Sequence, residues 1–337
     1  MPPGRYTRLV RLDAIGEAGH NRIASSHAVI VGCGALGTVV AELLARSGVG
    51  HLTLLDRDFV DLTNLHRQFL FDESDAAEGI PKAVAAERRL RAINSEIEIT
   101  SVVDDLRPRR VADLLGRPDV IIDGTDNFEA RFLLNDYAVE QGIPWIYGAA
   151  VGTYGIAMPV LPDRTACFRC VFDGPPEGLQ PTCETAGVLG PVTALIGSLQ
   201  AGVALQILSG NTDAVRDTIT TVDLWHGPLR EVSKPERDPD CPCCGHREFE
   251  WLNGKHDTPV SLCGRNAVQI HSERGVIDLA ALKTRLELEG TVRSNDFALR
   301  FALAPHEITV FRDGRAIVHG TQDPAVARGL YAKWIGS

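Results

Sequence analysis

The sequence lacks several features of secreted, membrane and nucleic-acid-binding proteins. Its start, Met1 to Tyr6, contains no apolar core of a secretory signal, so we expect a cytoplasmic protein. The formal net charge of −10 argues against nucleic acid as a main partner. The longest apolar stretch, Gly190 to Gly210, contains Ser198, Gln200 and many small residues. It predicts a buried helix or a subunit contact rather than a membrane span.

The sequence also has no internal repeats, no low-complexity segment and no long block of charge. Its 337 residues suggest about two domains, and the hydrophobic fraction of 44% is ample for packed cores. In the cytoplasm, the eight cysteines would serve as thiols, metal ligands or catalysts rather than form disulfides.

Residues 28 to about 150 alternate predicted strands with predicted helices. The strands are Ala28–Val31, Leu52–Leu55, Ile97–Val102, Val120–Ile122 and Trp145–Gly148. The helices are Leu36–Arg46, Pro81–Ile93, Val111–Leu115 and Phe128–Gln141. This alternation predicts an α/β fold with a Rossmann-like, doubly wound and mostly parallel sheet.

The pattern changes from about residue 151. Val151–Val160 and Ile219–Leu224 are typical of strands that extend the sheet in the antiparallel sense. We therefore expect a large domain over residues 1–250 and a small α+β extension over 251–337. In the extension we predict helices at Asp278–Leu288 and Pro324–Trp334, strands at Phe297–Leu303, Glu307–Phe311 and Arg315–His319, and a hairpin turn at Asp313-Gly314.

A glycine loop follows the first predicted strand. Gly32, Gly34 and Gly37 form a GxGxxG pattern that opens a helix, and the next strand ends at Asp56. Such a loop lets backbone approach phosphate, and the acid can bind ribose. Taken alone, the loop also fits a turn that binds no nucleotide.

The residues that follow Asp56 favour a triphosphate over a nicotinamide. Asn64, Arg67 and Gln68 form a polar cluster, and Lys82 lies at a helix start after a proline. A guanidinium matches phosphate oxygens, and an ammonium adds a second positive charge. The alternative for each residue alone is a solvated surface position.

Asp126 follows the predicted strand Val120–Ile122. The carboxyl ends of parallel strands are where such sheets bind ligands, and Mg²⁺ prefers one or two carboxylates together with substrate phosphates. Asp126 is therefore a candidate magnesium ligand. Its alternative role is to cap the helix that follows.

Two CxxC pairs predict a closed tetrahedral zinc site of Cys167, Cys170, Cys241 and Cys244. Four sulfur ligands leave no open position, so we expect a structural ion rather than a catalytic one. The alternative is a set of redox or free thiols. The sequence also leaves open whether Cys243 replaces one of the ligands.

Cys183 follows a Gly/Pro-rich loop and precedes the long apolar helix. A position near the positive end of a helix favours a reactive thiolate. The alternative is a buried or non-essential thiol. We interpret Cys33 as loop packing, and Cys263 has no partner that the sequence identifies.

Together these motifs resemble the MoeB/ThiF family of the ubiquitin-activating-enzyme superfamily. The resemblance covers about residues 4 to 250 and includes the RYxR start, the glycine loop, the D-x-D block, Pro-Lys, the T-D-N triplet, the T-C-E segment and both CxxC pairs. The tail looks like the C-terminal extension of some bacterial members. It has no active-site cysteine loop of a rhodanese domain.

The resemblance implies an adenylyltransferase that uses MgATP. Its substrate would be the C-terminal Gly-Gly carboxylate of a ubiquitin-like sulfur carrier (MoaD/ThiS-like), and pyrophosphate would leave. The implied nucleotide site comprises Gly32, Gly34, Ala35, Gly37, Asp56, Asp58, Asn64, Arg67, Lys82, Asp126 and Asn127. Asp126 would hold Mg²⁺, and Zn²⁺ would be structural. Ala35 departs from the family, where glycine is frequent, so its methyl group would narrow the space beside the adenylate.

The resemblance also implies partners. Arg8 would act as an arginine finger in the site of a second subunit, so we expect a homodimer. Cys183 matches a cysteine that attacks the acyl adenylate or joins a persulfide relay in some members and is dispensable in others. A cysteine desulfurase or a rhodanese would then supply sulfur. We expect neither nucleic acid nor a membrane as a partner.

Three other functions compete with this interpretation. The first is a superfamily relative that adenylates another substrate, such as a tRNA threonylcarbamoyladenosine dehydratase or a peptide adenylyltransferase. The second is an NAD-dependent dehydrogenase, which would explain neither Arg67 nor Lys82. The third is a non-catalytic scaffold that binds a ubiquitin-like protein. The sequence does not decide between molybdopterin, thiamin, tRNA-thiolation and amino-acid pathways.

Overall fold

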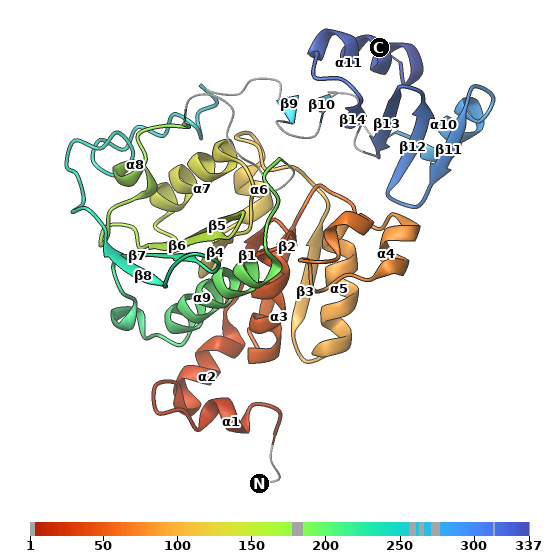
Figure 1. Ribbon diagram of the computed structural model, residues 1–337. Coiled ribbons are helices and arrows are strands. Elements are labelled where there is room, and N and C mark those ends of the chain that lie inside the picture. Colours follow the sequence, from red (N-terminus) through yellow and green to blue (C-terminus); the bar gives the residue numbers. More distant parts are fainter. Residues whose placement is uncertain are drawn as a thin grey trace. The chain divides into compact units, whose positions relative to one another are not determined.

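The computed structural model describes residues 4–176, 185–255, 261–262, 266–270, 277–312 and 314–336. It divides into two compact units, Met1–His256 and Asp257–Ser337 (Figure 1). Each unit has its own sheet and its own hydrophobic core.

The first unit contains an eight-stranded sheet of order β3-β2-β1-β4-β5-β6-β7-β8. The five strands from β3 to β5 are parallel, and the remaining strands pair antiparallel. This confirms the predicted doubly wound sheet with an antiparallel extension. The strands are β1 His27–Val31, β2 His51–Leu55, β3 Glu98–Val102, β4 Val120–Asp123, β5 Trp145–Val151, β6 Tyr154–Val160, β7 Thr218–Asp223 and β8 Arg230–Ser233.

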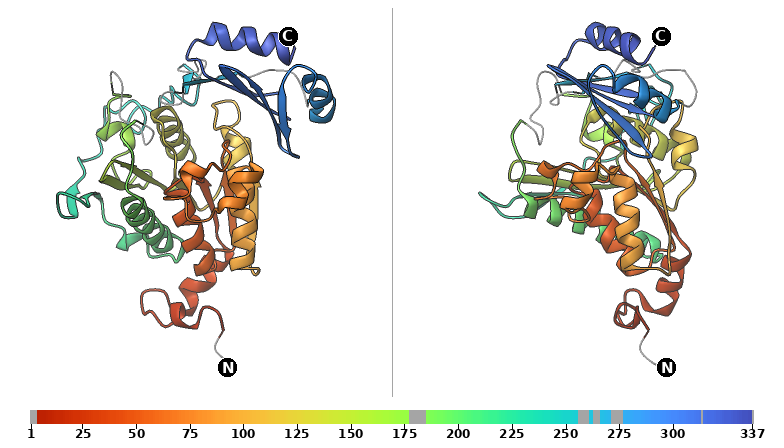
Figure 2. Two further views of the ribbon diagram at one scale, coloured as in Figure 1. Left: turned by 45° about the vertical axis from the view of Figure 1, so that its right-hand side comes forward. Right: turned by 90° about the vertical axis from the view of Figure 1, so that its right-hand side faces the viewer.

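Helices cover both faces of this sheet (Figure 2). Successive strand residues point to opposite faces, so Ile30 packs in one core with α3 and α5, while Val29 and Val31 pack in the other with α7. The helices are α1 Thr7–Val10, α2 Gly16–Ser25, α3 Gly37–Ser47, α4 Glu73–Glu78, α5 Lys82–Ile93, α6 Val111–Leu115, α7 Phe128–Gln141, α8 Phe168–Val171 and α9 Gly190–Leu208.

The antiparallel extension differs from the sequence prediction in two places. The segment predicted as one strand over Val151–Val160 divides at Gly152, where φ is +59°, so Val151 ends β5 and Tyr154 begins β6. Strand β8 was not predicted. All four of its residues are exposed. Because neither face of the strand is buried, its sequence does not alternate apolar and polar side chains.

Helix α9 is long and apolar enough to cross a membrane by length and composition. In this structure it packs against α3 and strands β4, β5 and β6. Val192, Ile196 and Ala204 are fully buried there, whereas Ser198 and Gly202 remain exposed. The prediction of a core helix is therefore confirmed for one side of α9.

The second unit has a six-stranded sheet of order β11-β12-β13-β14-β10-β9, paired antiparallel throughout. It confirms the predicted α+β extension, although Asp313 and Cys263 lie outside the described residues. Its elements are β9 Ser261–Leu262, β10 Ala267–Ile270, α10 Leu279–Leu286, β11 Thr291–Ser294, β12 Ala298–Leu303, β13 His306–Phe311, β14 Ala316–His319 and α11 Pro324–Trp334.

Candidate nucleotide site and cysteine cluster

The glycine loop lies at the carboxyl end of β1, between β1 and β4. Gly32 has φ +91°, and a Cβ on it would lie 2.5 Å from the carbonyl oxygen of Gly124. A Cβ on Gly37 would overlap the carbonyl of Gly32. Gly34 differs, because its Cβ would meet nothing closer than 3.9 Å. Two glycines therefore allow tight backbone packing, and the middle one leaves room for a ligand to approach the loop.

Asp56 is held directly beneath this loop. Its carboxylate accepts hydrogen bonds from Cys33 N at 2.6 Å and from Asp58 N at 2.7 Å. Burial raises the pKa of Asp56, and the ammonium of Lys82 opposes that shift. Each carboxylate oxygen keeps a further lone pair, so the side chain can still accept from ribose hydroxyls.

Lys82 and Asp58 form a partly buried ion pair beside Asp56. Lys82 Nζ lies 3.2 Å from Asp58 Oδ2, and Lys82 N donates to the carbonyl of Asp58 at 2.8 Å. A bridge between Phe59 and Pro81 fixes the start of α5 against this segment. An ammonium has three donors, so the side chain can contact Asp58 and phosphate oxygens together.

The loop after Asp58 reaches the glycine loop. Asn64 and Arg67 are half-buried, and Gln68 is buried with its Oε1 lacking a hydrogen-bond partner among the described residues. Gln68 Nε2 lies 4.0 Å from where a Cβ on Gly34 would be. Arg67 donates to the carbonyl of Thr63 at 3.0 Å within its own loop. A polar ligand bound beside Gly34 could donate a hydrogen bond to the buried Oε1 of Gln68.

The loop after β4 brings Asp126 to the same edge. Asn127, rather than Asp126, caps α7, because its side chain accepts from Ala130 N at 2.8 Å. Asp126 is exposed. Gly124, at the start of this loop, packs against the backbone of Gly32 and Gly37. The structure therefore joins the glycine loop, Asp56 to Asp58, Gln68, Lys82 and residues 124–127 at one end of the sheet.

Sequence reasoning missed Asp123 and Arg131, which lie beneath this loop. Asp123 is completely buried, and burial raises its pKa to about 6 despite the nearby guanidinium of Arg131. In the sequence Asp123 follows an apolar strand, and Arg131 resembles a surface position of the predicted helix. Only the packing of α7 against the sheet shows that both side chains are buried.

The four predicted zinc ligands form one cluster. The Sγ atoms of Cys167, Cys170, Cys241 and Cys244 all lie within 4.8 Å of one another, with pairs at 3.4 to 3.9 Å. A tetrahedral ion with bonds of about 2.3 Å needs ligand separations of about 3.8 Å. The thiols therefore fit such an ion.

Cys243 does not belong to this cluster. Its Sγ accepts a hydrogen bond from Asn135 Nδ2 at 3.2 Å, and the Asn135 Oδ1 accepts from Phe168 N at 2.8 Å. Asn135 thus links α7 to the chain on both sides of the cluster. The geometry favours Cys241 and Cys244 over Cys243 as partners of Cys167 and Cys170.

Comparison with known proteins shows the family of this chain. Residues 6–243 match the ThiF family. The chain belongs to the ThiF family. The resemblance that the motifs indicated is therefore confirmed.

The relatives of this ThiF-family chain include enzymes that act on sulfur carriers. It is 41% identical over 337 residues to "Sulfur carrier protein ThiS adenylyltransferase" of Bacillus subtilis, covering 99% of each chain. It is 36% identical to "SAMP-activating enzyme E1" of Haloferax volcanii, over 72% of this chain and 88% of that protein. It is 35% identical to "Sulfur carrier protein adenylyltransferase" of Thermus thermophilus, over 72% and 90%.

Solved structures share the fold of this ThiF-family chain. E. coli MccB with ATP has a TM-score of 0.63 at 22% identity, covering 72% of this chain and 75% of that one. The crystal structure of PaaA has a TM-score of 0.56 at 22% identity, over 68% and 82%. At this identity the likeness concerns the fold alone.

Arg8 of this ThiF-family protein lies at the other end of the sheet from the glycine loop. Its neighbours Arg5 and Tyr6 contact Ile93 and Asn94, at the C-terminus of α5, at 3.0 and 2.7 Å. Figure 1 shows α1 and α2 at this end of the first unit. The exposed Arg8 is therefore not near the nucleotide site of its own chain. Cys183 lies outside the described residues.

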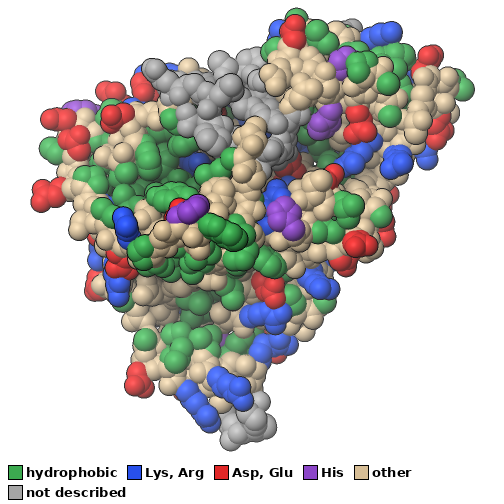
Figure 3. Space-filling view, viewed as in Figure 1, with side chains coloured by type: hydrophobic (Ala, Val, Ile, Leu, Met, Phe, Trp, Pro, Cys, Tyr) green, Lys and Arg blue, Asp and Glu red, His purple; other side chains and the backbone are tan. Residues whose placement is uncertain are grey.

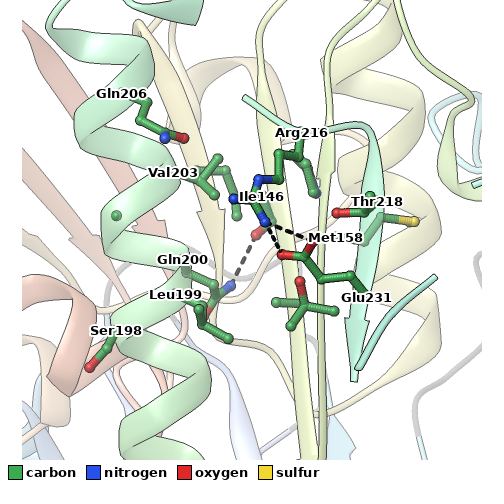
Figure 4. Close-up of a pocket in the computed structure, with 14 residues that line it drawn as sticks. Ile146, Met158, Ser198, Leu199, Gln200, Val203, Gln206, Arg216, Thr218 and Glu231 are labelled. Atoms are coloured by element: carbon green, nitrogen blue, oxygen red, sulfur yellow. Dashed lines mark hydrogen bonds and ion pairs between the residues drawn. The ribbon is translucent and has the colours of Figure 1, made fainter. Parts of the chain in front are cut away.

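A hollow of about 270 Å³ lies between α9 and the antiparallel strands. Figure 4 shows Ser198, Leu199, Val203 and Gln206 of α9 on one side of it. On the other side Arg216 makes two contacts of 2.7 Å with Glu231. A second hollow of about 210 Å³ lies along the other side of α9, beside α3, and is lined by Val39, Glu42, Leu43, Phe69, Ala194 and Ser198. Figure 3 shows hydrophobic side chains gathered on this face of the first unit.

Proposed function

We propose that this protein adenylates the C-terminal Gly-Gly carboxylate of a ThiS-like sulfur carrier protein, with MgATP as co-substrate. The observation that carries this proposal is the 41% identity to a ThiS adenylyltransferase over 99% of both chains. That match includes the second unit, whereas the archaeal and Thermus relatives cover 72% of this chain. This full-length match supports a carrier of the ThiS type and a role in thiamin biosynthesis.

The reaction needs charge neutralisation more than acid–base chemistry. A carboxylate oxygen of the carrier forms a bond to the α-phosphorus, the bond from that phosphorus to the bridging oxygen breaks, and pyrophosphate leaves. The carboxylate is already ionised at neutral pH, so no general base is required. Negative charge develops on the phosphate oxygens, and fixed cations lower the barrier.

The residues at the carboxyl edge fit these needs. Asp56 accepts from the ribose, and the open backbone at Gly34 faces the phosphates. Arg67 and Lys82 supply positive charge. Asp126 and the phosphates would hold Mg²⁺, which when bound neutralises phosphate charge. The side chain of Arg67 then exchanges its contact with Thr63 for a phosphate oxygen.

We also propose that the protein is a homodimer in which Arg8 completes the partner's site. Arg8 and the glycine loop lie at opposite ends of one chain, so Arg8 can serve a site only on another copy. A guanidinium from a partner would then neutralise charge on the leaving phosphates.

The exposed face of α9 is the surface that suits this pairing. Gly190 at its start packs against His66, since a Cβ on this glycine would lie 2.8 Å from the carbonyl oxygen of His66. Ser209 at its end contacts Arg22 of α2 at 3.4 Å. The helix thus runs about 28 Å from the nucleotide site to the N-terminal segment. Two copies packed with antiparallel α9 helices bring each N-terminal segment beside the other copy's Arg67 loop.

The cysteine cluster and Cys183 have separate proposed roles. The cluster holds a structural Zn²⁺ that ties residues 167–170 to 241–244. Cys183 takes part in the later transfer of sulfur to the adenylated carrier, with a cysteine desulfurase or a rhodanese as donor. If Cys183→Ala protein forms thiocarboxylated carrier at the normal rate, this role of Cys183 is wrong.

ATP–pyrophosphate exchange against purified carriers tests the proposed function. We expect exchange with a ThiS-type carrier and none with the same carrier lacking its last two glycines. A MoaD-type carrier and a short peptide serve as competing substrates. Exchange only with the peptide would indicate a peptide adenylyltransferase instead. If none of the tested substrates supports exchange, the proposed adenylation is wrong.

A further inference from the structure

The loop that carries Asp126 is fixed by side chains that lie below it. Thr125 donates to Asp123 Oδ1 through its backbone N at 2.8 Å and through its hydroxyl at 2.7 Å. Arg131 Nη2 donates to the carbonyl of Thr125 at 2.9 Å. Asn127 is fixed on the other side as the cap of α7. Both neighbours of Asp126 are therefore held in place.

Arg131 has little freedom to move. Its guanidinium carbon lies 5.1 Å from the ring centre of Phe128 and 5.3 Å from that of Tyr147. Its Nε lies 3.9 Å from Asp123 Oδ2, and neither atom has a hydrogen-bond partner within the part of the chain that the structure describes. Both side chains are buried, at 8% and 0% exposure. The aromatic contacts hold the guanidinium where its Nη2 donates to the loop carbonyl.

The support continues into α9. Gln200 Nε2 donates to the carbonyl of Asp123 at 2.8 Å and to that of Ile146 at 3.0 Å. It enters where the pairing of β4 with β5 ends at Ile122 and Ile146 (Figure 4). The backbone of Asp123 is thus fixed from α9 while its side chain is fixed from α7.

A buried ion pair at 3.9 Å is a weak source of stability, because desolvating both charges costs about as much as their attraction returns. An apolar pair would fill this space at least as well. The charged pair instead fixes the backbone of Thr125, because Asp123 accepts from its amide and Arg131 donates to its carbonyl.

We propose that Arg131 is a positioning residue that sets the orientation of the Asp126 carboxylate toward a divalent cation. The proposal rests on the proposed role of Asp126 as the cation ligand. Arg131 does not touch the cation or the substrate. It acts through Thr125, and Asp123 and Gln200 complete the support.

The probe is Mn²⁺ binding to the ATP-bound protein without carrier, measured by electron paramagnetic resonance. In Arg131→Lys protein the charge remains but the planar fork that reaches Thr125 is lost. We expect the Mn²⁺ dissociation constant to rise about tenfold, as for other residues that orient a metal ligand. ATP affinity measured in EDTA should stay within about twofold.

Two further variants keep the test decisive. Thr125→Val removes only the hydroxyl donor to Asp123 and should weaken Mn²⁺ binding by a smaller factor, even if Arg131→Lys folds poorly. Arg91→Lys is the matched control, because Arg91 Nη2 also donates to a backbone carbonyl, that of Ile99, at 2.9 Å. It lies on α5 away from this loop, so Mn²⁺ binding should not change.

Three results would count against the proposal. Unchanged Mn²⁺ affinity in folded Arg131→Lys and Thr125→Val proteins overturns it. An equal loss of ATP affinity in EDTA also overturns it, because the whole nucleotide site would then depend on Arg131. If Asp126→Asn leaves Mn²⁺ binding unchanged, the proposed cation site itself is wrong, and the role of Arg131 falls with it.

Discussion

At the scale of single residues, the candidate site is a set of charges in different degrees of contact with water. Lys82 and Asp56 are buried, and Asp126 is exposed. Buried groups are oriented before a ligand arrives, and this saves reorganisation during the reaction. The exposed acid depends on its neighbours for orientation.

Replacing Lys82 with methionine should lower ATP–pyrophosphate exchange by about 100-fold or more, because a preorganised cation at the phosphates is lost. Lys255→Met is the control, since Lys255 makes an exposed ion pair with Glu250 at 3.2 Å. Circular dichroism checks that both proteins fold. Exchange within about twofold of wild type would remove Lys82 from the site.

Asp123 should make stability depend on pH. Its pKa in the folded chain is about 6, against 3.8 for an ordinary aspartate. Between these values the folded chain binds more protons than the unfolded chain, so this group's contribution to stability falls as pH rises. The Asp123→Asn protein does not titrate there. We therefore expect the difference in thermal midpoint, wild type minus variant, to decrease as the pH is raised from about 4 to about 7. If the thermal midpoints of both proteins change equally with pH, Asp123 is not buried as described.

At the scale of elements, α7 connects the two functional regions of the first unit. Its N-terminus is capped beside Asp126, and Asn135 near its middle contacts both Cys243 and the residue after Cys167. Nine consecutive residues from Arg131 to Val139 are buried. Helix α7 therefore spans from the loop that carries Asp126 to the cysteine cluster.

Two neighbouring cysteines provide a matched test of the metal site. Cys241→Ser removes a ligand and should reduce bound zinc from about one per chain to near zero, with a lower thermal midpoint. Cys243→Ser changes only the sulfur beside Asn135 and should keep its zinc. Metal content measured by elemental analysis decides the assignment. Equal loss in both proteins would place Cys243 among the ligands.

At the scale of the whole molecule, one chain carries the two parts of the proposed site at opposite ends of its sheet. A two-fold symmetric dimer would have two complete sites, because each copy donates its Arg8 to the other copy's site. The surface proposed for such a pair is the exposed face of α9, which has a hollow on each side.

Mixing two inactive proteins tests this arrangement. Arg8→Ala and Asp126→Asn should each lose exchange activity. In a mixed dimer, the Arg8→Ala chain has an intact Asp126 and receives Arg8 from its partner. Random pairing of equal amounts should therefore restore about a quarter of wild-type activity. The control is a Ser198→Arg change in both chains, which should prevent pairing and recovery. No recovery from dimers that exchange subunits would contradict a shared site.

The sequence by itself determined the alternation of strands and helices, the glycine loop, the acid at the end of β2 and the four clustered cysteines. These are local signals, because periodicity and spacing can be recognised within short segments of the sequence. The tertiary structure decided that Cys243 lies outside the four-cysteine cluster, that Asn127 rather than Asp126 caps α7, and that Arg131 and Asp123 are buried together. Those outcomes depend on which faces of distant segments pack against each other, and no local pattern encodes that.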